Sequence, residues 1–343
     1  MRVLVLGGSG FIGPHLVRLL VERGHRAAVF NRGQRPDTLP GSVERLRGDL
    51  ERPAQAREAW ARFAPEVAVY MVPLGEEDAR RVADALAGVV GRVVGLSSGD
   101  VNRAFGRVNR FEGGPPEDGP LTEGSPLRQR LFPYRDQADG PADWRYSYDK
   151  ILAERVLLGN PRLPGTVLRL PAVYGQGDPF RRLAPYLRRM DDGRPAILLQ
   201  RDMAAWRWSR GHVENAAQAI ALAVERPDAG GVFNVADPQA LGEAEWVRRI
   251  GRLAGWRGEI VPVEATDLPA GMRQDGDFSQ DVVMDSGRIR RELGYTEKLD
   301  IDAWIAKTVA WERQHPPAEG VVPPPDYAAE DACLAAATGK DAP

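Results

Sequence analysis

The opening residues of the chain constrain its fold more than any other segment. A short β-branched and leucine run at residues 2–6 leads straight into Gly7, Gly10 and Gly13. Apolar residues then recur at helical spacing over residues 11–23, which predicts a strand, a tight turn and a helix. Glycines in such a turn allow the sharp bend and bring backbone close to a phosphate at the helix N-terminus. This context predicts an open α/β sheet that binds a dinucleotide.

Strands and helices alternate along the first half of the chain. We expect further strands at residues 26–30, 66–72, 93–97 and 166–170, and helices at 52–63, 76–90 and 147–158. Alternation of this kind favours a Rossmann doubly wound parallel sheet with right-handed crossovers. A smaller mixed α/β lobe should follow, with helices at residues 180–189, 213–225, 243–254 and 301–315.

We divide the chain into three parts. Residues 1–170 form the expected nucleotide-binding domain, residues 171–315 a substrate-binding lobe interleaved with it, and residues 316–343 a tail. The tail is rich in Pro and Ala and lacks a core pattern, so we expect it to be flexible or to lie as an arm on another surface. Residues 102–145 lose all periodicity, which predicts a long loop that acts as a lid or a contact surface.

Composition excludes several classes of function. The formal net charge is −2 over 343 residues, which gives no general attraction to nucleic acid or to an anionic membrane. The apolar run at the N-terminus is too short for a signal peptide or a membrane span, so we expect a cytoplasmic location. One cysteine, Cys333, and four scattered histidines have no metal-ligand spacing, so we expect neither a metal site nor thiol catalysis.

Cofactor contacts are expected first at the glycine turn, which includes Phe11 and Ile12, and then at the end of the second strand. Asn31 and Arg32 stand where an acidic residue would bind the ribose hydroxyls of NAD. An arginine there can instead pair with the 2′-phosphate of NADP, which favours NADP over NAD. Two alternatives stay open: Asn31 serving the ribose of NAD, and Arg32 as a solvated turn residue.

Three further strand ends complete the expected cofactor site. Asp49 and Leu50 follow a further strand that we expect between those at residues 26–30 and 66–72. They suit the adenine edge, although Asp49 could also be an ordinary helix cap. Val72 and Ser97 stand at the ends of the next two predicted strands, on the edge of the sheet where such folds bind ligands.

A tyrosine and a lysine four residues apart form the predicted catalytic centre. Tyr146 and Lys150 would share one helical face, and Lys150 is the only lysine in the first 297 residues. An adjacent ammonium favours the phenolate, and its compact head can also hold the nicotinamide ribose. Ser98 would hydrogen-bond the reacting oxygen, whereas the spacing of the rival Tyr148 should turn it away from Lys150. Taken alone, the tyrosine and lysine could also belong to a surface helix.

The chain resembles the extended short-chain dehydrogenase/reductases of the NAD-dependent epimerase/dehydratase family, from Met1 to about His315. The resemblance rests on the glycine turn, on Ser98, Tyr146 and Lys150, and on residues 168–175, 212–217 and 285–295. It implies cofactor contacts from Pro171 and Val173. It also implies an oxidation-and-return cycle on a sugar, often UDP- or dTDP-linked, through a keto intermediate with tightly held cofactor. A homodimer formed through helices that include residues 147–158 is implied as well.

Several residues depart from the family pattern. Gly99 breaks the acidic pair of the dehydratases, while Asp100 is either a substrate-shaping acid or a strand-end cap. Trp208 replaces an arginine that would grip the nucleotide diphosphate. Three nearby or similar arginines could take phosphate or be solvated charges: Arg207, Arg210 and Arg273.

The leading hypothesis is therefore an NAD(P)-dependent epimerase acting on a small-molecule sugar substrate, with dehydratase or decarboxylase chemistry as its nearest variant. The alternatives are an NADPH-dependent carbonyl reductase on a small or natural-product ketone, and a protein that binds NAD(P) without catalysis. Net consumption of added NADPH would separate the reductase from the epimerase. Fold and motif alone do not establish a reaction.

Overall fold

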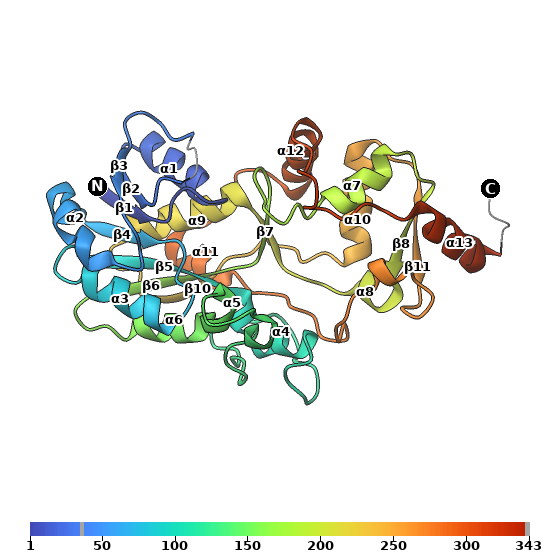
Figure 1. The fold of residues 1–343 in the computed structure, drawn as a ribbon, viewed down its shortest axis with the longest axis horizontal. Helices are drawn as coiled ribbons and strands as arrows, with labels where there is room; N and C mark the ends of the chain where they lie inside the picture. The colour runs from blue at the N-terminus through green and yellow to red at the C-terminus, as the bar shows by residue number, and fades with distance from the viewer. Residues whose placement is uncertain (35–37, 340–343) are drawn as a thin grey trace.

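The computed structural model describes residues 1–34 and 38–339. Its largest feature is a parallel sheet of seven strands in the order β10-β6-β5-β4-β1-β2-β3, on the left of Figure 1. The strands are β1 Arg2–Leu6, β2 Arg26–Asn31, β3 Glu44–Arg47, β4 Val67–Tyr70, β5 Arg92–Ser98, β6 Gly165–Leu170 and β10 Gly231–Asn234. The expected Rossmann doubly wound fold is confirmed, and the strand order reverses between β1 and β4.

Helices cover both faces of this sheet (Figure 1). One face carries α1 Gly13–Glu22, α9 Val213–Glu225 and α11 Gly287–Leu293. The other carries α2 Arg57–Phe63, preceded by the 3-10 helix η1 Pro53–Ala56, with α3 Glu76–Leu86 and α6 Lys150–Leu158. Alternating residues of β1 serve the two faces, since Val3 and Val5 pack with α1 whereas Leu4 and Leu6 pack with α2 and α3. The carboxyl ends of the strands therefore form the edge open to ligands.

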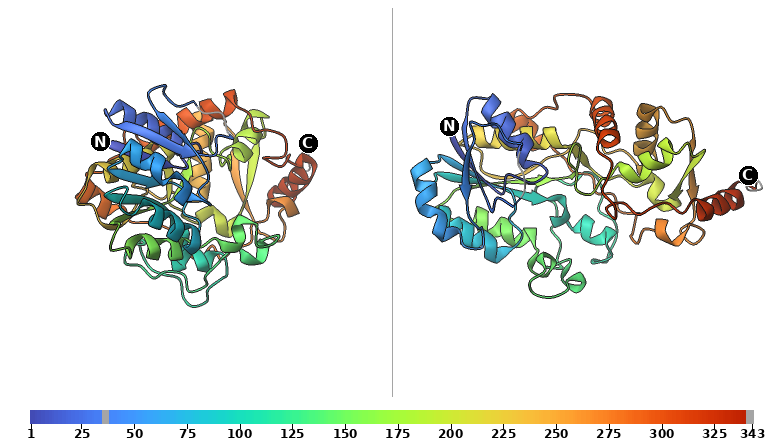
Figure 2. Two further views of the ribbon diagram at one scale, coloured as in Figure 1. Left: turned by 60° about the vertical axis from the view of Figure 1, so that its left-hand side comes forward. Right: turned by 45° about the horizontal axis from the view of Figure 1, so that its top comes forward.

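A smaller lobe lies beyond that edge, as the right view in Figure 2 shows. It contains α7 Ala184–Asp191, β8 Ala196–Gln200, α8 Arg201–Ala205, α10 Glu243–Ala254, β11 Glu259–Val263, η4 Ala270–Met272 and α12 Ile301–Gln314. A short parallel pair joins the two parts: β7 Ala172–Tyr174 and β9 Arg210–His212. Because α9 and β10 return to the large sheet, the lobe is interleaved with it in sequence.

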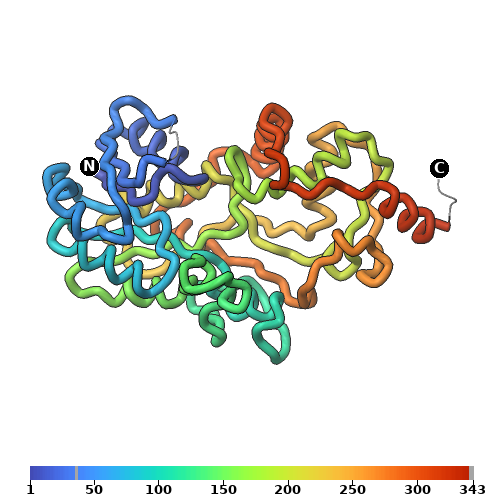
Figure 3. Tube along the Cα trace, in the orientation of Figure 1, coloured from blue at the N-terminus to red at the C-terminus, as the bar shows by residue number. Residues whose placement is uncertain are grey.

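The C-terminal segment crosses the small lobe and ends in α13 Tyr327–Thr338, at the red end of the tube in Figure 3. Glu330 of α13 is buried and forms an ion pair with Arg189 of α7 at 2.6 Å. The phenol of Tyr327 donates a hydrogen bond to Asp192. Up to Gly339 this segment therefore lies as an arm on the small lobe, and residues 340–343 of the expected tail lie outside the described residues.

Residues 102–145 were expected to be one long loop, and this is wrong in part. The segment contains α4 Arg103–Val108 and η3 Arg135–Gln137, and α5 Trp144–Ser147 starts within it. The 3-10 helix η2 Gly99–Val101 precedes it. Leu121 forms a bridge with Met284, and the side-chain amide of Asn234 on β10 donates to the Leu121 carbonyl at 2.8 Å. These tertiary contacts hold the segment against the rest of the molecule, and its role as a lid or as a contact surface stays a prediction. Within the described part of the chain, no helix has the length and apolarity needed to cross a membrane.

Candidate active site

The glycine turn after β1 has the geometry that close approach of backbone to a ligand requires. Gly7 adopts φ +86°, and a Cβ there would lie 3.0 Å from Cγ2 of Val72. At Gly13 a Cβ would lie 2.3 Å from the Gly8 carbonyl oxygen, so only glycine allows α1 to pack against the turn. A Cβ on Gly10 would meet nothing within 4 Å. Gly10 is thus open toward any ligand on the turn, while Gly13 serves packing.

The first turn of α1 suits an anion. It contains no acidic residue, its N-cap residue Ile12 makes no side-chain cap, and Pro14 occupies one of its first positions. Its free N–H groups and the positive end of the helix dipole therefore face outward. Phe11 lies beside the turn, near Gly177 of the following lobe. These residues fit the pyrophosphate of a dinucleotide.

The ends of β2 and β3 meet at the far side of this turn. The Asn31 side-chain oxygen accepts hydrogen bonds from the Gly33 N–H, at 2.9 Å, and from the guanidinium of Arg47. Arg32 is exposed, which fits either a contact with a ligand or a solvated turn residue. Sequence reasoning missed Arg47 altogether.

Asp49 and Leu50 follow Arg47 along the chain. The carboxylate of Asp49 accepts a hydrogen bond from the Glu51 N–H at 3.0 Å within a turn. It caps no helix, because η1 begins at Pro53 and has Arg52 as its N-cap residue. Leu50 is half-buried against the core between the sheet and α2. A contact of either residue with adenine stays a prediction.

Lys150 is buried at the carboxyl edge of the sheet. Its ammonium donates to the carbonyls of Pro73, at 2.7 Å, and Leu96, at 3.2 Å. Burial lowers the pKa of Lys150 to about 8, and Asp100 opposes part of that shift. One of its three N–H donors therefore stays free of the carbonyls.

The expectation that Tyr146 and Lys150 share one helical face is wrong. Helix α5 ends at Ser147 and α6 begins only at Lys150, because Asp149 is extended and caps α6 by accepting from the Ile151 N–H at 2.9 Å. Tyr146 is 38% exposed, and its ring lies under the guanidinium of Arg135, 4.7 Å from it.

Tyr148 occupies the place beside Lys150 that was assigned to Tyr146. The Lys150 nitrogen lies 5.8 Å from the Tyr148 ring centroid, which contradicts the expectation that Tyr148 turns away. Its hydroxyl donates to the carboxylate of Asp100 at 2.6 Å. Burial first, and then Asp100, raises the pKa of Tyr148 well above its usual value. Tyr148 therefore stays protonated at neutral pH in this setting.

Ser97, Ser98 and Asp100 form the end of β5 and the turn after it. Ser98 is partly exposed, and its hydroxyl accepts a hydrogen bond from the Asp100 N–H at 3.2 Å. Ser97 is buried, and its hydroxyl has no partner among the described residues. Burial raises the pKa of Asp100, while the hydrogen bond from Tyr148 lowers it. The Asp100 carboxylate caps no backbone N–H: one of its oxygens accepts from Tyr148, and the other has no partner among the described residues, so its role in shaping the substrate site stays a prediction.

Arg128 is a buried member of this cluster that sequence reasoning did not find. Its Nε–H donates to the Asp100 carbonyl at 2.5 Å, and its guanidinium lies 3.8 Å from the Asp149 carboxylate. Both side chains of that ion pair are fully buried. The long segment thereby joins the end of β5 to the start of α6. In a chain so rich in arginine, no local signal singles this one out.

The three arginines expected to bind substrate phosphate all have protein partners. Arg207 forms an ion pair with Asp281 at 2.6 Å, and buried Arg210 pairs with Glu243. Arg273 donates to the carbonyls of Leu268, at 2.9 Å, and Thr266, at 3.0 Å. These contacts fit ordinary protein charges better than a diphosphate grip.

The remaining predicted cofactor residues border the same edge of the sheet. Val72 is 43% exposed next to Gly7. Pro171 joins β6 to β7 and lies against Gly211, and Val173 on β7 is buried in the core shared with α9. The structure thus places Val72 where a ligand could touch it and Val173 mainly in packing.

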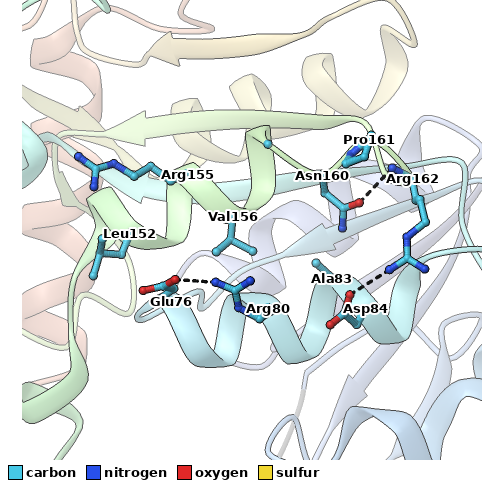
Figure 4. A pocket seen from close by; sticks show the side chains of 11 residues that line it. Glu76, Arg80, Ala83, Asp84, Leu152, Arg155, Val156, Asn160, Pro161 and Arg162 are labelled. Atoms are coloured by element: carbon cyan, nitrogen blue, oxygen red, sulfur yellow. Dashed lines mark hydrogen bonds and ion pairs between the residues drawn. The ribbon is translucent and has the colours of Figure 1, made fainter.

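A groove of about 560 Å³ lies elsewhere, between α3 and α6 (Figure 4). Arg80 pairs with Glu76 and Arg162 with Asp84 along its sides, while Val156 and Ala83 lie between them. The groove runs toward Gly159, at the opposite end of α6 from Lys150. It therefore belongs to the outer helical face and not to the candidate active site.

Comparison with known sequences covers more than half of the chain. A sequence profile of the NAD dependent epimerase/dehydratase family matches residues 3–94 and 126–236. The matched parts contain the glycine turn, Arg128 and Lys150. Ser98, Asp100 and much of the segment 102–145 fall in the interval between them.

Individual relatives include enzymes of different reactions. The chain is 29% identical over 286 residues to the 2′-dehydrokanamycin reductase of Streptomyces kanamyceticus, covering 81% of this chain and 73% of the relative. It is 28% identical over 336 residues to the dTDP-glucose 4,6-dehydratase of Streptomyces griseus, covering 92% and 94%. The structure of the Thermus thermophilus UDP-glucose 4-epimerase in complex with NAD superposes with a TM-score of 0.67 at 23% identity, covering 92% of this chain and all of that one. This last likeness is one of fold.

Proposed function

This chain belongs to the NAD dependent epimerase/dehydratase family, and from that premise we propose that it oxidises a hydroxyl-bearing carbon of a small, sugar-like substrate, or reduces the corresponding ketone, with NAD(P). The observation that carries the proposal is the position of Lys150, a buried ammonium at the carboxyl edge of the sheet, next to the strand that ends in Ser98. When bound, the nicotinamide would accept a hydride from the substrate carbon or return one to it.

The chain's own residues bind and orient in this scheme. The turn from Gly7 to Gly13 would hold the pyrophosphate, and the third N–H of Lys150 would hold the nicotinamide ribose. Ser98, which is partly exposed, would donate its hydroxyl hydrogen to the reacting oxygen of the substrate. The charge of Lys150 also favours any negative charge that develops near that oxygen.

A tyrosine would move the proton, and the contacts favour Tyr148 over Tyr146. Tyr148 is the tyrosine that lies beside Lys150 and donates to Asp100. With its raised pKa the phenol is protonated at neutral pH, so it would enter the reaction carrying a proton, as the reduction of a ketone requires. Tyr146, exposed under Arg135, would then contribute to the substrate entrance.

Two candidate reactions share this site. An epimerase would return the hydride to the other face of the same carbon, as the resemblance implies, with UDP- or dTDP-sugars as substrates. A reductase would release an alcohol and consume NADPH. The protein partners of Arg207, Arg210 and Arg273 favour a substrate without a nucleotide diphosphate, and hence the reductase. The relative from Streptomyces kanamyceticus, a reductase by name, supports the same choice.

A cytoplasmic homodimer is part of the proposal. The outer face formed by α3 and α6, with the groove of Figure 4, is the surface through which the resemblance implies pairing. Apolar Val156 and Ala83 between flanking ion pairs suit such a self-complementary contact. Sedimentation of the purified chain checks it.

One assay separates the two reactions. The protein is incubated with NADPH and keto derivatives of aminoglycosides and of simple sugars, and in parallel with UDP- and dTDP-glucose. Stoichiometric loss of NADPH absorbance with a keto substrate supports the reductase. Interconversion of a nucleotide sugar without net change in the nicotinamide supports the epimerase. A K150M variant should lose either activity, and turnover that survives this change would contradict the assignment of Lys150.

A further inference from the structure

The carboxyl group of Asp100 is buried without the partners that an ionised carboxylate needs. Asp100 is 6% exposed, and its Oδ2 atom accepts one hydrogen bond, from the Tyr148 hydroxyl at 2.6 Å. Its Oδ1 atom has no partner among the described residues, and Asp100 forms no ion pair within that part of the chain. A buried carboxylate is costly unless hydrogen bonds and a counter-charge satisfy it. These contacts therefore favour a proton on Asp100.

The charged and titratable side chains that face Asp100 bind mainly elsewhere. They are Arg128, Tyr134, Tyr148, Asp149 and Lys150. Arg128 donates its Nε–H to the Asp100 backbone carbonyl at 2.5 Å, and its guanidinium lies 3.8 Å from the Asp149 carboxylate. The Lys150 ammonium donates to two backbone carbonyls. Burial is the largest effect on the pKa of Asp100 and raises it, while the hydrogen bond from Tyr148 and the two cations lower it.

Tyr148 in turn needs a proton source close by. Its ring is buried beside Lys150, and the ring of Tyr134 packs on it with centroids 5.2 Å apart. Burial raises the pKa of Tyr148 well above its usual value, so a phenolate left behind after proton transfer is costly. The titratable group in hydrogen-bond contact with the phenol oxygen is Asp100.

The contact between Asp100 and Tyr148 allows two arrangements of hydrogens. With Asp100 ionised, the phenol hydrogen points at the carboxylate and is not available to a substrate. With Asp100 protonated, the carboxyl hydrogen can bond to the phenol oxygen, and the phenol's own hydrogen is free. The distance of 2.6 Å between the two oxygens suits both arrangements. Only the second arrangement lets Tyr148 donate to a ketone oxygen.

We infer that Asp100 and Tyr148 form a proton relay, in which Asp100 returns to Tyr148 the proton that Tyr148 gives to the substrate. The phenol O–H bond breaks as an O–H bond forms on the ketone oxygen, and the carboxyl O–H bond of Asp100 breaks as a new phenol O–H bond forms. The hydride comes from NADPH, as in the proposed reductase reaction on which this inference rests. Asp100 is left as a carboxylate and takes a proton from water before the next cycle. It acts through Tyr148 and does not touch the substrate.

The first measurement detects the proton on Asp100 without any substrate. Infrared difference spectra of the full-length wild type against D100N are recorded at neutral pH in H₂O and in D₂O. The wild type should show the carbonyl band of a protonated carboxylic acid, shifted in D₂O, and D100N should lack it. Bands of other buried acids such as Asp237 cancel, because both proteins contain them. In Y148F the band should move, because the carboxyl hydrogen loses its acceptor.

The second measurement counts the protons that move with the hydride. NADPH consumption with a keto sugar is followed in mixtures of H₂O and D₂O. The wild-type rate should fall along a curve as the deuterium fraction rises, because two protons move together, whereas D100N should give a straight line. D100N should lower kcat by about tenfold or more and change KM by less than about twofold, because its amide still donates to the phenol oxygen but gives up no proton.

Asp136 provides the matched control. Its carboxylate lies in the same long segment and its side chain is 78% exposed, so D136N should keep the wild-type kcat, infrared band and curved dependence. A wild type without the protonated-carboxyl band, a band that Y148F leaves unmoved, or a curvature that D100N retains overturns this inference alone. A folded wild type that turns over neither keto compounds nor nucleotide sugars overturns the proposed function, and the relay with it.

Discussion

The two halves of the candidate site are built in different ways. The phosphate half is a single turn of consecutive residues, in which Gly7 and Gly13 make contacts that only glycine allows. The reacting half assembles side chains from distant segments: Asp100 after β5, Arg128 in the long segment, and Tyr148 and Lys150 around the start of α6. The phosphate half depends on backbone conformation, whereas the reacting half depends on buried polar and charged groups that must hydrogen-bond or pair with one another. Substitutions should therefore break the two halves in different ways.

The largest expected effect separates packing from binding within the glycine turn. G13A should destabilise the protein by about 2 kcal/mol or more and abolish measurable nucleotide binding, because its Cβ would clash with the Gly8 carbonyl. G10A should leave the melting temperature unchanged, since its Cβ meets nothing within 4 Å of protein, yet weaken nucleotide binding by blocking close approach. Thermal melts and calorimetry measure both. Equal stability of the two variants would contradict the division of roles.

The second effect decides which tyrosine belongs to the reacting half. Y148F should lower kcat by about 10²-fold or more, the size usual for loss of a positioned proton donor, with little change in nucleotide affinity. Y146F should change kcat by less than about threefold, because Tyr146 is exposed and apart from Lys150. Each substitution removes one phenolic hydroxyl, and the two positions are only two residues apart, so each variant is a control for the other. A larger loss of kcat in Y146F than in Y148F would contradict this assignment and favour Tyr146, the tyrosine that the sequence alone predicts.

The third effect is a pH dependence of Lys150. Burial lowers the pKa of Lys150 to about 8, below its usual value in an unfolded chain of about 10.4. Above pH about 8 the folded protein loses the ammonium, so turnover should fall along a limb with that midpoint. Between these two pKa values the unfolded state binds more protons, so stability should rise as turnover falls.

Measurements of kcat and of urea unfolding over the same pH series test whether stability rises while turnover falls. In K150M the rise in stability across this window should be absent. Turnover that holds constant to pH about 10 would show that the ammonium is not required or not depressed.

The smallest effect concerns a buried carboxylate that lies outside both halves. Asp237 follows β10, is buried, and accepts from the Asn215 amide at 3.4 Å. Burial raises its pKa to about 7, and Glu297 adds to this shift. Folded protein thus binds the extra proton, and the stability that it gives is full below pH about 4 and is lost as pH rises through about 7.

The loss should be on the order of 2 kcal/mol in the wild type and absent in D237N, which carries no titrating carboxyl. Unfolding by urea at pH about 5 and about 8 measures it. A wild type whose unfolding midpoint falls no more than that of D237N would contradict the raised pKa. Nucleotide affinity should stay unchanged in D237N, because Asp237 touches neither half directly.

The same difference explains what the sequence could predict. The strand, turn and helix at the N-terminus follow from neighbouring residues, and α9 and α10 begin and end at the residues that periodicity predicts. The start of α6 was misplaced, because Asp149 competes with the helix as its cap and thereby separates Tyr146 from Lys150. Arg128 and Arg47 could not be found, because their roles depend on which distant carbonyls, carboxylates and glycines they meet.

The most direct test of the central claim is nucleotide binding by the purified chain and its K150M variant. Native mass spectrometry, with identification of any small molecules released on denaturation, counts bound nucleotides per chain, and fluorescence titration with NADPH gives the affinity. We predict one nicotinamide nucleotide per wild-type chain, and weaker nucleotide binding by K150M at an unchanged or higher melting temperature. A folded wild type that binds no nicotinamide nucleotide, or a K150M variant that binds as tightly, would contradict it.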